Sequence, residues 1–433
     1  MLKNKYRLLK IFAIKFLLLG YFLLSGLQAT DRFPRPDFQG DYQIPEIQIN
    51  KPTKNSLVPL IDVLILAVAL VLSAKFAIFD RSRILIVCLM VFLLLYFGFV
   101  KAGCICSIGS VQNVVLSFFN DNYYLPWFVL LFFLLPLVFA VFFGRVFCGA
   151  VCPLGAIQDI FIIKPIKMPL WIKKVFGLVP PFFLGLAVLY SAIDGIFIIC
   201  RADPFVSFFR LSGNENMFII GIMFLLVGTV IARPYCRFIC PYGFLLGILS
   251  RFSLTHMHIY IHKCIKCGLC SNSCPFDAIR LPTLDNYPGN RKKGVRYLFL
   301  LFICFPFFIF FGGFLGYFSG PLLSKIDPVV SLADRIILEN QNKELSYTLE
   351  SKGFRKTNES IEKLFETAKK TRDKFILGTS MLGVFMGICV FFTIFRLSVW
   401  RKRDCYEPDK GECLSCGRCL EYCPVNKNIS RIE

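Results

Sequence analysis

Long runs of apolar residues, separated by short polar stretches rich in lysine and arginine, dominate this chain of 433 residues. A helix of about 20 apolar residues is long enough to cross the hydrocarbon core of a bilayer. Stretches that reach or approach this length are 9–27, 57–79, 84–100, 125–143, 175–192, 217–232, 297–317 and 375–395. The pattern predicts a mostly α-helical, polytopic membrane protein with about eight spans. The composition agrees, because 56% of the residues are hydrophobic, well above the share in soluble domains.

The positions of basic residues predict the orientation. Basic clusters occur at 3–10, 81–83, 164–174, 291–296 and 401–403. If the N-terminus is cytoplasmic, alternating spans place all of these clusters in the cytoplasm, as the positive-inside rule requires. This accounts for much of the net charge of +21, and no basic stretch is interleaved with aromatic residues as in a nucleic-acid-binding module. The stretch 9–27 is either an uncleaved anchor, which we favour, or a signal peptide.

Two runs of cysteine share the spacing C-x2-C-x2-C-x3-C-P. The first run is Cys264, Cys267, Cys270 and Cys274, and the second is Cys413, Cys416, Cys419 and Cys423. This is the bacterial ferredoxin pattern for a [4Fe-4S] cluster, and soft thiolate ligands suit iron–sulfur chemistry. Structural zinc sites instead use paired C-x2-C knuckles separated by a longer loop. We expect two [4Fe-4S] clusters, either self-contained or crossed, with the fourth cysteine of each run serving the other cluster.

A second motif is duplicated at the expected membrane surface, with the form x-R-x-[FY]-C-x3-C-P-x-G. Its cysteines are Cys148 and Cys152 in the first copy and Cys236 and Cys240 in the second, 88 residues later. The proline suits the first turn of a helix, so a cysteine lies at the positive helix N-terminus, which favours thiolate. We expect these thiols to hold a further metal or cluster or to carry out redox chemistry. A structural Cys-Pro corner is the alternative.

The remaining cysteines and the histidines limit the cofactors. Cys104, Cys106 and Cys200 are expected to face outside, where a disulfide, a soft metal such as copper, or a purely structural role is open to them. None of the three histidines lies in a predicted span, so no transmembrane haem is expected. No haem-attachment motif, dinucleotide fingerprint or P-loop occurs. Electrons are therefore expected from a partner protein or a lipid quinol, and no catalytic residue is predicted.

The predicted organisation alternates membrane and polar segments. They are an anchor or signal-like span (1–29), an external proline-rich segment (30–56), a membrane core with the duplicated motif (57–250), the first ferredoxin segment (251–290), a span (291–323), an external segment (324–374), a span (375–400) and the second ferredoxin segment (401–433). The external segment 324–374 carries Leu364 and Ala368 at helical spacing. This predicts an amphipathic helix that either caps the spans or docks a partner.

The combination of both motif types resembles the NosR/NapH-type membrane-bound 4Fe-4S polyferredoxins. The resemblance covers roughly 101–275 and the C-terminal cysteine run, and the four motifs occur in the order of that family. The resemblance implies an electron-transfer component of a respiratory oxidoreductase system rather than a stand-alone enzyme. Its expected place is the bacterial inner membrane, with both ferredoxin segments in the cytoplasm. The external segments are too short for the flavin domain of NosR, and no flavin is expected.

In that family, electrons pass from the quinol pool or a cytoplasmic donor towards an outside-facing reductase system. We expect the same function here, with the membrane, a quinol or cytoplasmic donor, and an external reductase or its maturation factors as partners, and no nucleic acid. The alternative is a redox-dependent assembly, copper-handling or regulatory factor for such a reductase. In that case Cys104, Cys106 and Cys200 would bind metal outside.

Overall fold

The computed structural model describes residues 57–103, 107–121, 123–210, 215–259, 264–283, 291–341, 347–357, 360–399 and 401–425. It is mostly helical, which confirms the predicted class. Five helices are long and apolar enough to cross a membrane: Leu57–Phe79, Arg83–Val100, Leu170–Ile193, Lys293–Ser324 and Ile361–Ser398. A sixth is added if the sharply bent pair Pro204–Arg210 and Glu215–Gly228 forms one span.

The predicted spans coincide with these helices in most places. The stretch 125–143 forms a shorter apolar helix, Trp127–Phe143, and the stretch 217–232 lies largely in the second arm of the bent pair. The stretch 9–27 lies outside the described residues. The total of about eight spans therefore stays a prediction.

The central bundle contains both copies of the membrane motif. Its elements are α2 (Leu57–Ala74), η1 (Lys75–Phe79), α3 (Arg83–Leu93), η2 (Leu94–Val100), α4 (Ser107–Phe119), α5 (Trp127–Phe143), η3 (Phe147–Val151), α6 (Pro153–Ile160), α7 (Leu170–Phe176), α8 (Val179–Asp194), α9 (Ile198–Ala202), α10 (Pro204–Arg210), α11 (Glu215–Gly228), α12 (Pro234–Phe238), α13 (Pro241–Leu249) and η4 (Ser250–Phe252). The largest buried cluster includes Phe147 and Leu154 of the first motif and Tyr235 and Tyr242 of the second. The two motifs therefore meet at the centre of the bundle.

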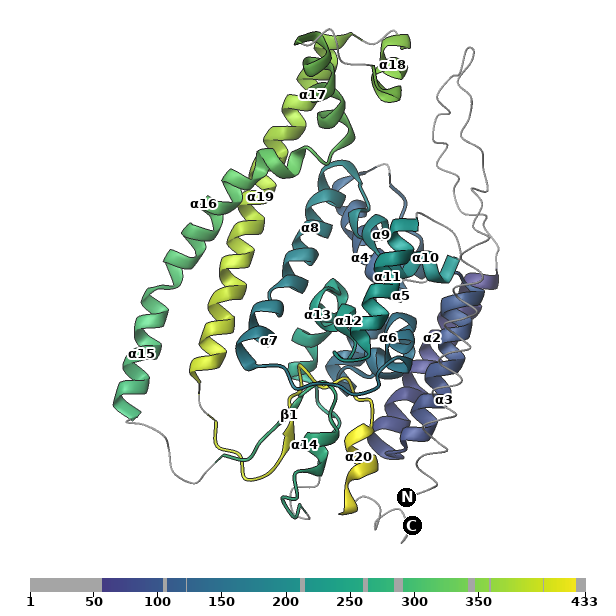
Figure 1. Cartoon of the computed structure of the whole chain (residues 1–433), viewed down its shortest axis with the longest axis vertical. Coiled ribbons are helices and arrows are strands. Elements are labelled where there is room, and N and C mark those ends of the chain that lie inside the picture. The colour runs from purple at the N-terminus through teal and green to yellow at the C-terminus, as the bar shows by residue number, and fades with distance from the viewer. Residues whose placement is uncertain are drawn as a thin grey trace.

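The two ferredoxin segments form one unit at one end of the molecule (Figure 1). The first contains α14 (Leu269–Ser273) and β1 (Ile279–Arg280), and the second contains β2 (Glu407–Pro408) and α20 (Arg418–Tyr422). Strands β1 and β2 pair antiparallel, with Ile279 opposite Pro408 and Arg280 opposite Glu407. Segments that are far apart in the sequence are thereby joined by a shared sheet.

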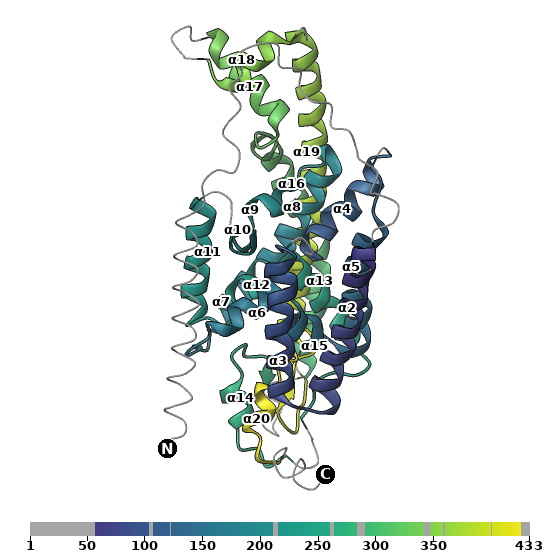
Figure 2. The ribbon, with the colours of Figure 1, turned by 90° about the vertical axis from the view of Figure 1, so that its right-hand side faces the viewer.

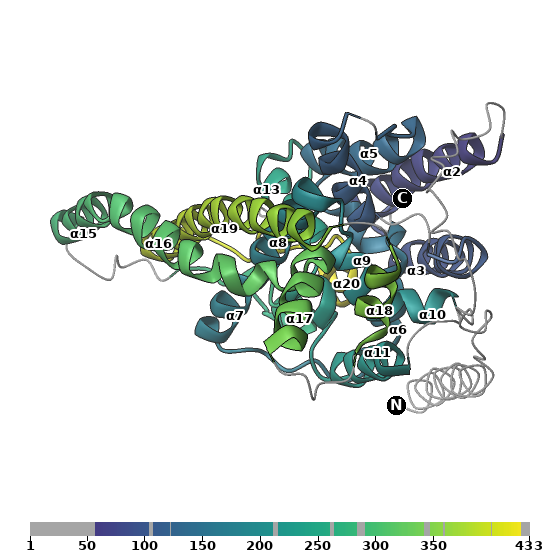
Figure 3. The same cartoon turned by 90° about the horizontal axis from the view of Figure 1, so that it is seen from above.

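A helical hairpin lies between the two ferredoxin segments in the sequence and projects away from the bundle (Figure 3). One arm of the hairpin is α15 (Arg291–Ile303) followed by α16 (Phe305–Ser324), which together make the span Lys293–Ser324. The other arm is the long helix α19 (Ile361–Ser398), which packs mainly against α16. A side chain at Gly312, Gly316 or Gly387 would collide with the backbone of the facing helix. Small residues at four-residue spacing allow such close packing in membranes.

Helices α17 (Pro328–Gln341) and α18 (Leu349–Lys356) lie at the opposite end from the ferredoxin segments (Figure 2). Leu364 and Ala368 at the start of α19 are buried against Val330, Ala333 and Ile336 of α17. The amphipathic helix predicted in the segment 324–374 is thus present, and its apolar face packs against the chain itself.

Candidate iron–sulfur sites

Both ferredoxin loops have the same backbone conformation around their second cysteine. Lys266 and Gly268, on either side of Cys267, have φ angles of 53° and 76°. Ser415 and Gly417, on either side of Cys416, have φ angles of 52° and 73°. Left-handed backbone is rare outside glycine, so its repetition at Lys266 and Ser415 marks a specific local geometry. It turns each loop tightly around a central space.

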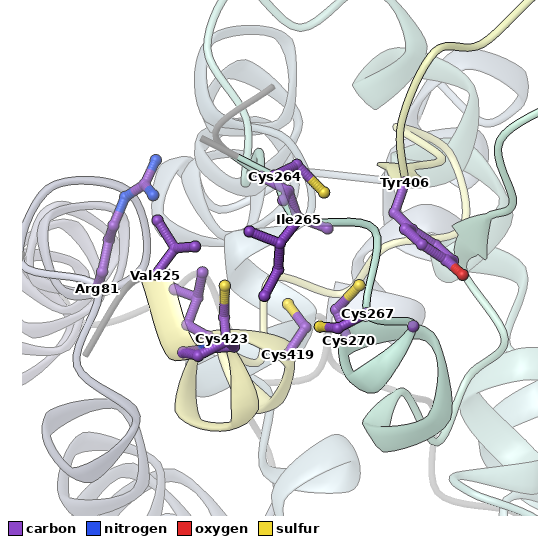
Figure 4. Close-up of a pocket in the computed structure, with 13 residues that line it drawn as sticks. Arg81, Cys264, Ile265, Cys267, Cys270, Tyr406, Cys419, Cys423 and Val425 are labelled. Atoms are coloured by element: carbon purple, nitrogen blue, oxygen red, sulfur yellow. The ribbon is translucent and has the colours of Figure 1, made fainter. Parts of the chain in front are cut away.

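The first cavity, called site I below, combines cysteines of both runs. Its lining thiols are Cys264, Cys267 and Cys270 of the first run and Cys419 and Cys423 of the second. Figure 4 shows these side chains gathered around one space, with Cys419 supplied by α20 and Cys423 by the residue directly after it. The structure therefore places the fourth cysteine of the second run with the first three cysteines of the first run.

The second cavity, site II, has the reciprocal composition. It is lined by Cys413, Cys416 and Cys419 of the second run and by Cys274 of the first. Cys419 lines both site I and site II, so the two cavities are neighbours. Each cavity thus combines three cysteines of one run with the fourth cysteine of the other, as the crossed alternative predicts.

The third cavity, site III, brings the duplicated membrane motif together. Its lining includes Cys148, Cys152, Cys236 and Cys240. Most other lining residues are apolar, among them Phe147, Leu154 and Phe209, while Asp203 and Tyr242 add polar groups. The sequence predicted the four thiols but gave no signal for Asp203. This residue directly precedes α10 and is distant from both motifs in the sequence, although it lines the same cavity.

Hydrogen-bond donors face the thiols of site III. Arg145 Nη2 donates to Cys148 Sγ at 3.8 Å, and Gln158 Nε2 donates to Cys236 Sγ at 3.3 Å. The backbone N–H of Gly243 donates to Cys240 Sγ at 3.3 Å. Donors of this kind stabilise sulfur that carries negative charge.

Buried guanidinium groups provide a further test of whether the cavities suit a negatively charged iron–sulfur cluster. Arg145 Nε, Arg237 Nη2 and Arg418 Nε are buried without a hydrogen-bond partner among the described residues. Arg145 and Arg237 share a cavity of about 120 Å³ with Cys236 and Cys240 of site III, and Arg418 lines site II. Buried cationic N–H groups are costly when unpaired. Their positions suit the negative charge that thiolate-bound iron–sulfur clusters carry.

Each of the three cavities is lined by four thiols or more. Within the described parts of the chain, no three Cys, His, Asp or Glu side chains are arranged to hold a single metal ion. The iron–sulfur assignment therefore rests on the cysteine spacing and on the hydrogen-bond donors and cations around the thiols.

The two membrane motifs exchange their arginines. Arg145 of the first copy reaches Gly243 of the second, and Arg233 of the second reaches Gly155 of the first, so that a side chain at either glycine would crowd the guanidinium. Arg233 also donates to the carbonyl oxygen of Cys148. Since these arginines and glycines are equivalent positions of the repeat, the copies pack with approximate twofold symmetry around site III.

Asp159 compensates part of the charge of three arginines that lie between site III and site II. It forms ion pairs with Arg83 at 2.8 Å, Arg233 at 3.2 Å and Arg418 at 3.2 Å, and its side chain is almost fully buried. Burial opposes ionisation, but the three cations outweigh it and hold the pKa of Asp159 well below its usual range. Arg83 also donates to the carbonyl oxygen of Cys416 in the second ferredoxin loop.

Burial changes one expectation about the membrane motif. The position of Cys240 at a helix N-terminus, directly before Pro241, predicts a lowered thiol pKa. Burial instead raises the pKa of Cys240 well above its usual value, and the hydrogen bond from the backbone N–H of Gly243 only partly offsets it. Helix geometry alone therefore does not keep this sulfur as a thiolate.

Of the three cysteines expected to face outside, the structure describes only Cys200, which lines none of the three cavities. Cys104 and Cys106 lie outside the described residues. Cys200 is exposed as a residue, and its sulfur lies 3.5 Å from Gln112 Oε1. The structure therefore leaves an outward metal or disulfide site at these residues as a prediction.

Comparison with known proteins supports the assignment of the cavities. Two models described as 4Fe-4S binding domain match this chain, one over residues 125–179 and 216–259 and the other over 258–280. The first match includes all four thiols of site III, and the second includes the first ferredoxin run. The chain thus carries ferredoxin-type 4Fe-4S binding segments together with several helices that are apolar enough to cross a membrane.

Individual relatives match over limited stretches. The chain is 34% identical over 71 residues to the uncharacterized protein MJ0749 of Methanocaldococcus jannaschii, which is 16% of this chain and 29% of that protein. It is 33% identical over 70 residues to YccM of Escherichia coli (strain K12), provisionally named an electron transport protein, covering 16% of this chain and 19% of YccM. The uncharacterized protein MJ0750 of Methanocaldococcus jannaschii is 27% identical over 198 residues, covering 44% of this chain and 81% of that protein. No solved structure matches.

Proposed function

We propose that this chain is a membrane-integral electron carrier in which sites I, II and III form one continuous relay. The observation that carries the proposal is the adjacency of the three sites. Cys419 lines both site I and site II. Between site II and site III, Cys148 packs in the same cluster as Leu414 and Cys416.

The thiols would hold the cofactors in a defined way. Cys264, Cys267, Cys270 and Cys423 would hold one cluster, and Cys274, Cys413, Cys416 and Cys419 a second. The four cysteines of site III would hold a third. When bound, a [4Fe-4S] cluster accepts and releases one electron at a potential set by its charge, hydrogen bonds and exposure.

The surrounding residues adjust and protect these sites. Arg145, Gln158 and the backbone of Gly243 donate hydrogen bonds to sulfurs of site III, which favours added negative charge there. Phe147, Leu154 and Phe209 line the same cavity and restrict water. Site I is more open, because Cys267 is exposed and the neighbouring Ile265 is 65% exposed. The relay therefore runs from an accessible end to a buried end.

The direction proposed is between a quinol pool or cytoplasmic donor and a reductase system on the other side of the membrane. The ferredoxin segments lie at one end of the bundle, and site III lies within it, so electrons that reach site III have entered the helical core (Figure 1). The similarity to YccM supports an electron-transport role. The membrane orientation and the respiratory reductase as acceptor come from the charge pattern and the family resemblance.

Anaerobic purification followed by iron and acid-labile sulfide analysis tests the relay directly. Three cubane clusters predict about twelve irons per chain, and EPR signals of reduced clusters should appear when a quinol is added. Replacing Cys148, Cys152, Cys236 and Cys240 together by serine should remove about four irons. The matched control replaces Cys88, Cys304, Cys389 and Cys405, which line none of the three cavities. This control variant should retain the full iron content of the wild type.

Electron transfer supplies the decisive readout. The variant without the four thiols of site III should reduce an external acceptor at least tenfold more slowly than the control variant. An unchanged rate would show that site III is not part of the route. A wild-type content of about eight irons would leave the membrane motif without a cluster.

A further inference from the structure

A cavity of about 370 Å³ lies beside site I and is lined mainly by cationic side chains. The cations are Arg251, Arg280, Arg396, Arg401, Arg403 and Lys410. Ile259 and Tyr406 line both this cavity and site I. We call it the basic cavity. Its volume is within the range of small-molecule binding sites.

Distant parts of the chain build the basic cavity. Arg251 follows α13, Arg280 belongs to β1, and Arg396 lies in the last turn of α19. Arg401 and Lys410 come from the second ferredoxin segment. The cations are therefore gathered by the fold and do not merely follow one another in the sequence.

Carboxylates compensate only part of this charge. Asp409 pairs with Arg280 at 3.0 Å and with Arg396 at 3.6 Å, and Glu407 lies 3.9 Å from Arg403. Among the described lining residues these two are the acidic side chains, and Glu412 outside the lining also pairs with Arg280 at 2.9 Å. Arg251 and Arg401 form no ion pair with any carboxylate that the structure describes. The basic cavity therefore has an excess of positive charge.

Burial and nearby cations both act on two groups of the lining, Arg251 and His256. Burial, and then the charge of Arg396, lower the pKa of Arg251. Burial, and then the charges of Lys410 and His258, lower the pKa of His256 to about 4. An anion in the cavity would relieve this repulsion, because each cation would gain an opposite charge in a partly dehydrated space.

We propose that the basic cavity binds a phosphate group. Guanidinium groups match phosphate oxygens with paired N–H donors, and several arginines can share one phosphate. A group with two or more negative charges balances the excess better than a single carboxylate does. The phosphate can belong to a dissolved compound or to a lipid headgroup, since Arg396 ends a helix long enough to cross a membrane.

A bound phosphate would connect α19 of the hairpin to the two ferredoxin segments. Arg396 contributes from α19, Arg280 from the first ferredoxin segment and Lys410 from the second. Ligand binding to the folded state alone raises its stability by mass action. Occupancy should therefore protect the full-length protein against thermal unfolding, independently of whether electrons flow through the sites.

The test compares two double variants with the same change in charge. Arg251→Gln with Arg401→Gln removes the cations that lack a carboxylate partner. Lys369→Gln with Lys374→Gln removes two exposed lysines of α19 near its other end. Phosphate binding by both double variants is measured on the full-length protein. The iron content of each variant is checked first, so that a misfolded variant is recognised.

Two probes distinguish the sources of phosphate. Inorganic pyrophosphate is titrated in detergent by calorimetry, and retention of phosphatidylglycerol over phosphatidylcholine is measured after reconstitution in nanodiscs. Pyrophosphate binding that weakens at least tenfold only in the arginine variant supports a dissolved ligand. Selective loss of phosphatidylglycerol from that variant supports a headgroup. If both probes behave alike in the two variants, the basic cavity is not a phosphate site.

Discussion

Gly149 and Leu414 are in direct backbone contact, although one belongs to the membrane motif and the other to the second ferredoxin loop. A side chain at position 149 would collide with the carbonyl oxygen of Leu414. Cys148 adjoins Gly149, and Cys416 follows Leu414 closely, so this contact is where site II approaches site III. Glycine is required here by close approach and not by an unusual backbone angle.

Gly149→Ala should therefore push the second ferredoxin loop away from the bundle. Overpacking of this kind costs about 1–3 kcal/mol of unfolding free energy. It should also slow electron transfer between site II and site III, because the distance grows. Stopped-flow EPR at each site measures that step. The matched control is Gly353→Ala in α18, where a new Cβ meets nothing within 4 Å. The control should keep the wild-type rate, and equal rates in both variants would contradict the contact's role.

Crossed ligation predicts a distinctive pattern of iron loss. Cys264 and Cys423 would hold the same cluster, so each serine variant should lose about four irons, and so should the double variant. Cys264→Ser combined with Cys274→Ser should instead lose about eight, because these residues would serve different clusters. Iron and sulfide analysis distinguishes the cases, with Cys405→Ser as a control. Self-contained clusters would give the opposite result for the two double variants.

Glu412 predicts an acid-dependent loss of stability. Burial opposes its ionisation, but the charges of Lys173, Arg280 and Lys174 outweigh it and lower its pKa from 4.5 to about 2. A depressed carboxyl pKa contributes stability that is present above pH 4.5 and is lost as the pH falls toward 2. The contribution is about 3 kcal/mol.

The measurement compares chemical unfolding of the wild type and Glu412→Gln from pH 7 down to pH 3. The difference between their unfolding free energies should shrink as the pH falls, because protonation removes the charge that the variant already lacks. Because Glu412 directly precedes Cys413, the iron content is measured at each pH, and only points at which both proteins retain the same iron are compared. A difference that does not change with pH would exclude a charged role for Glu412.

Arg145 should raise the reduction potential of site III. Its N–H donates to Cys148 Sγ, and hydrogen bonds to charged groups contribute about 1.5–3 kcal/mol. For one electron, this corresponds to about 65–130 mV. Arg145→Gln should lower the potential of site III by at most this amount, because the hydrogen bond exists in both redox states and only its strengthening on reduction shifts the potential. Arg145→Lys, which keeps the charge, should lower it by less. EPR-monitored redox titration measures it, with site I as the internal reference. An unshifted potential in both variants would remove Arg145 from this role.

Local features of the sequence predicted the loops and most helices. The spacing of Cys264, Cys267 and Cys270 constrains one short loop, and apolar runs such as 57–79 need only their own length to form a helix. The duplicated motif indicated that Cys148 and Cys236 are related, and the structure brings them into one cavity.

Other features depend on contacts between distant segments and could not be read locally. Asp159 carries no motif, and its importance appears only when Arg83, Arg233 and Arg418 converge on it. The raised thiol pKa of Cys240 follows from burial, which helix position alone does not indicate. The combination of both cysteine runs in each cavity depends on distant segments meeting, as they also do where β1 pairs with β2.

That pairing has a consequence for how the protein is made. Under crossed ligation, the first ferredoxin loop lacks its fourth thiol when it is synthesised, because that thiol belongs to the second loop. Helices α15 to α19 must be synthesised and folded back to the same end of the molecule before the two loops can meet. Cluster insertion would then wait for correct placement of the hairpin. A chain whose hairpin is misplaced would lack both clusters at once, and the iron content would report on the quality of its assembly.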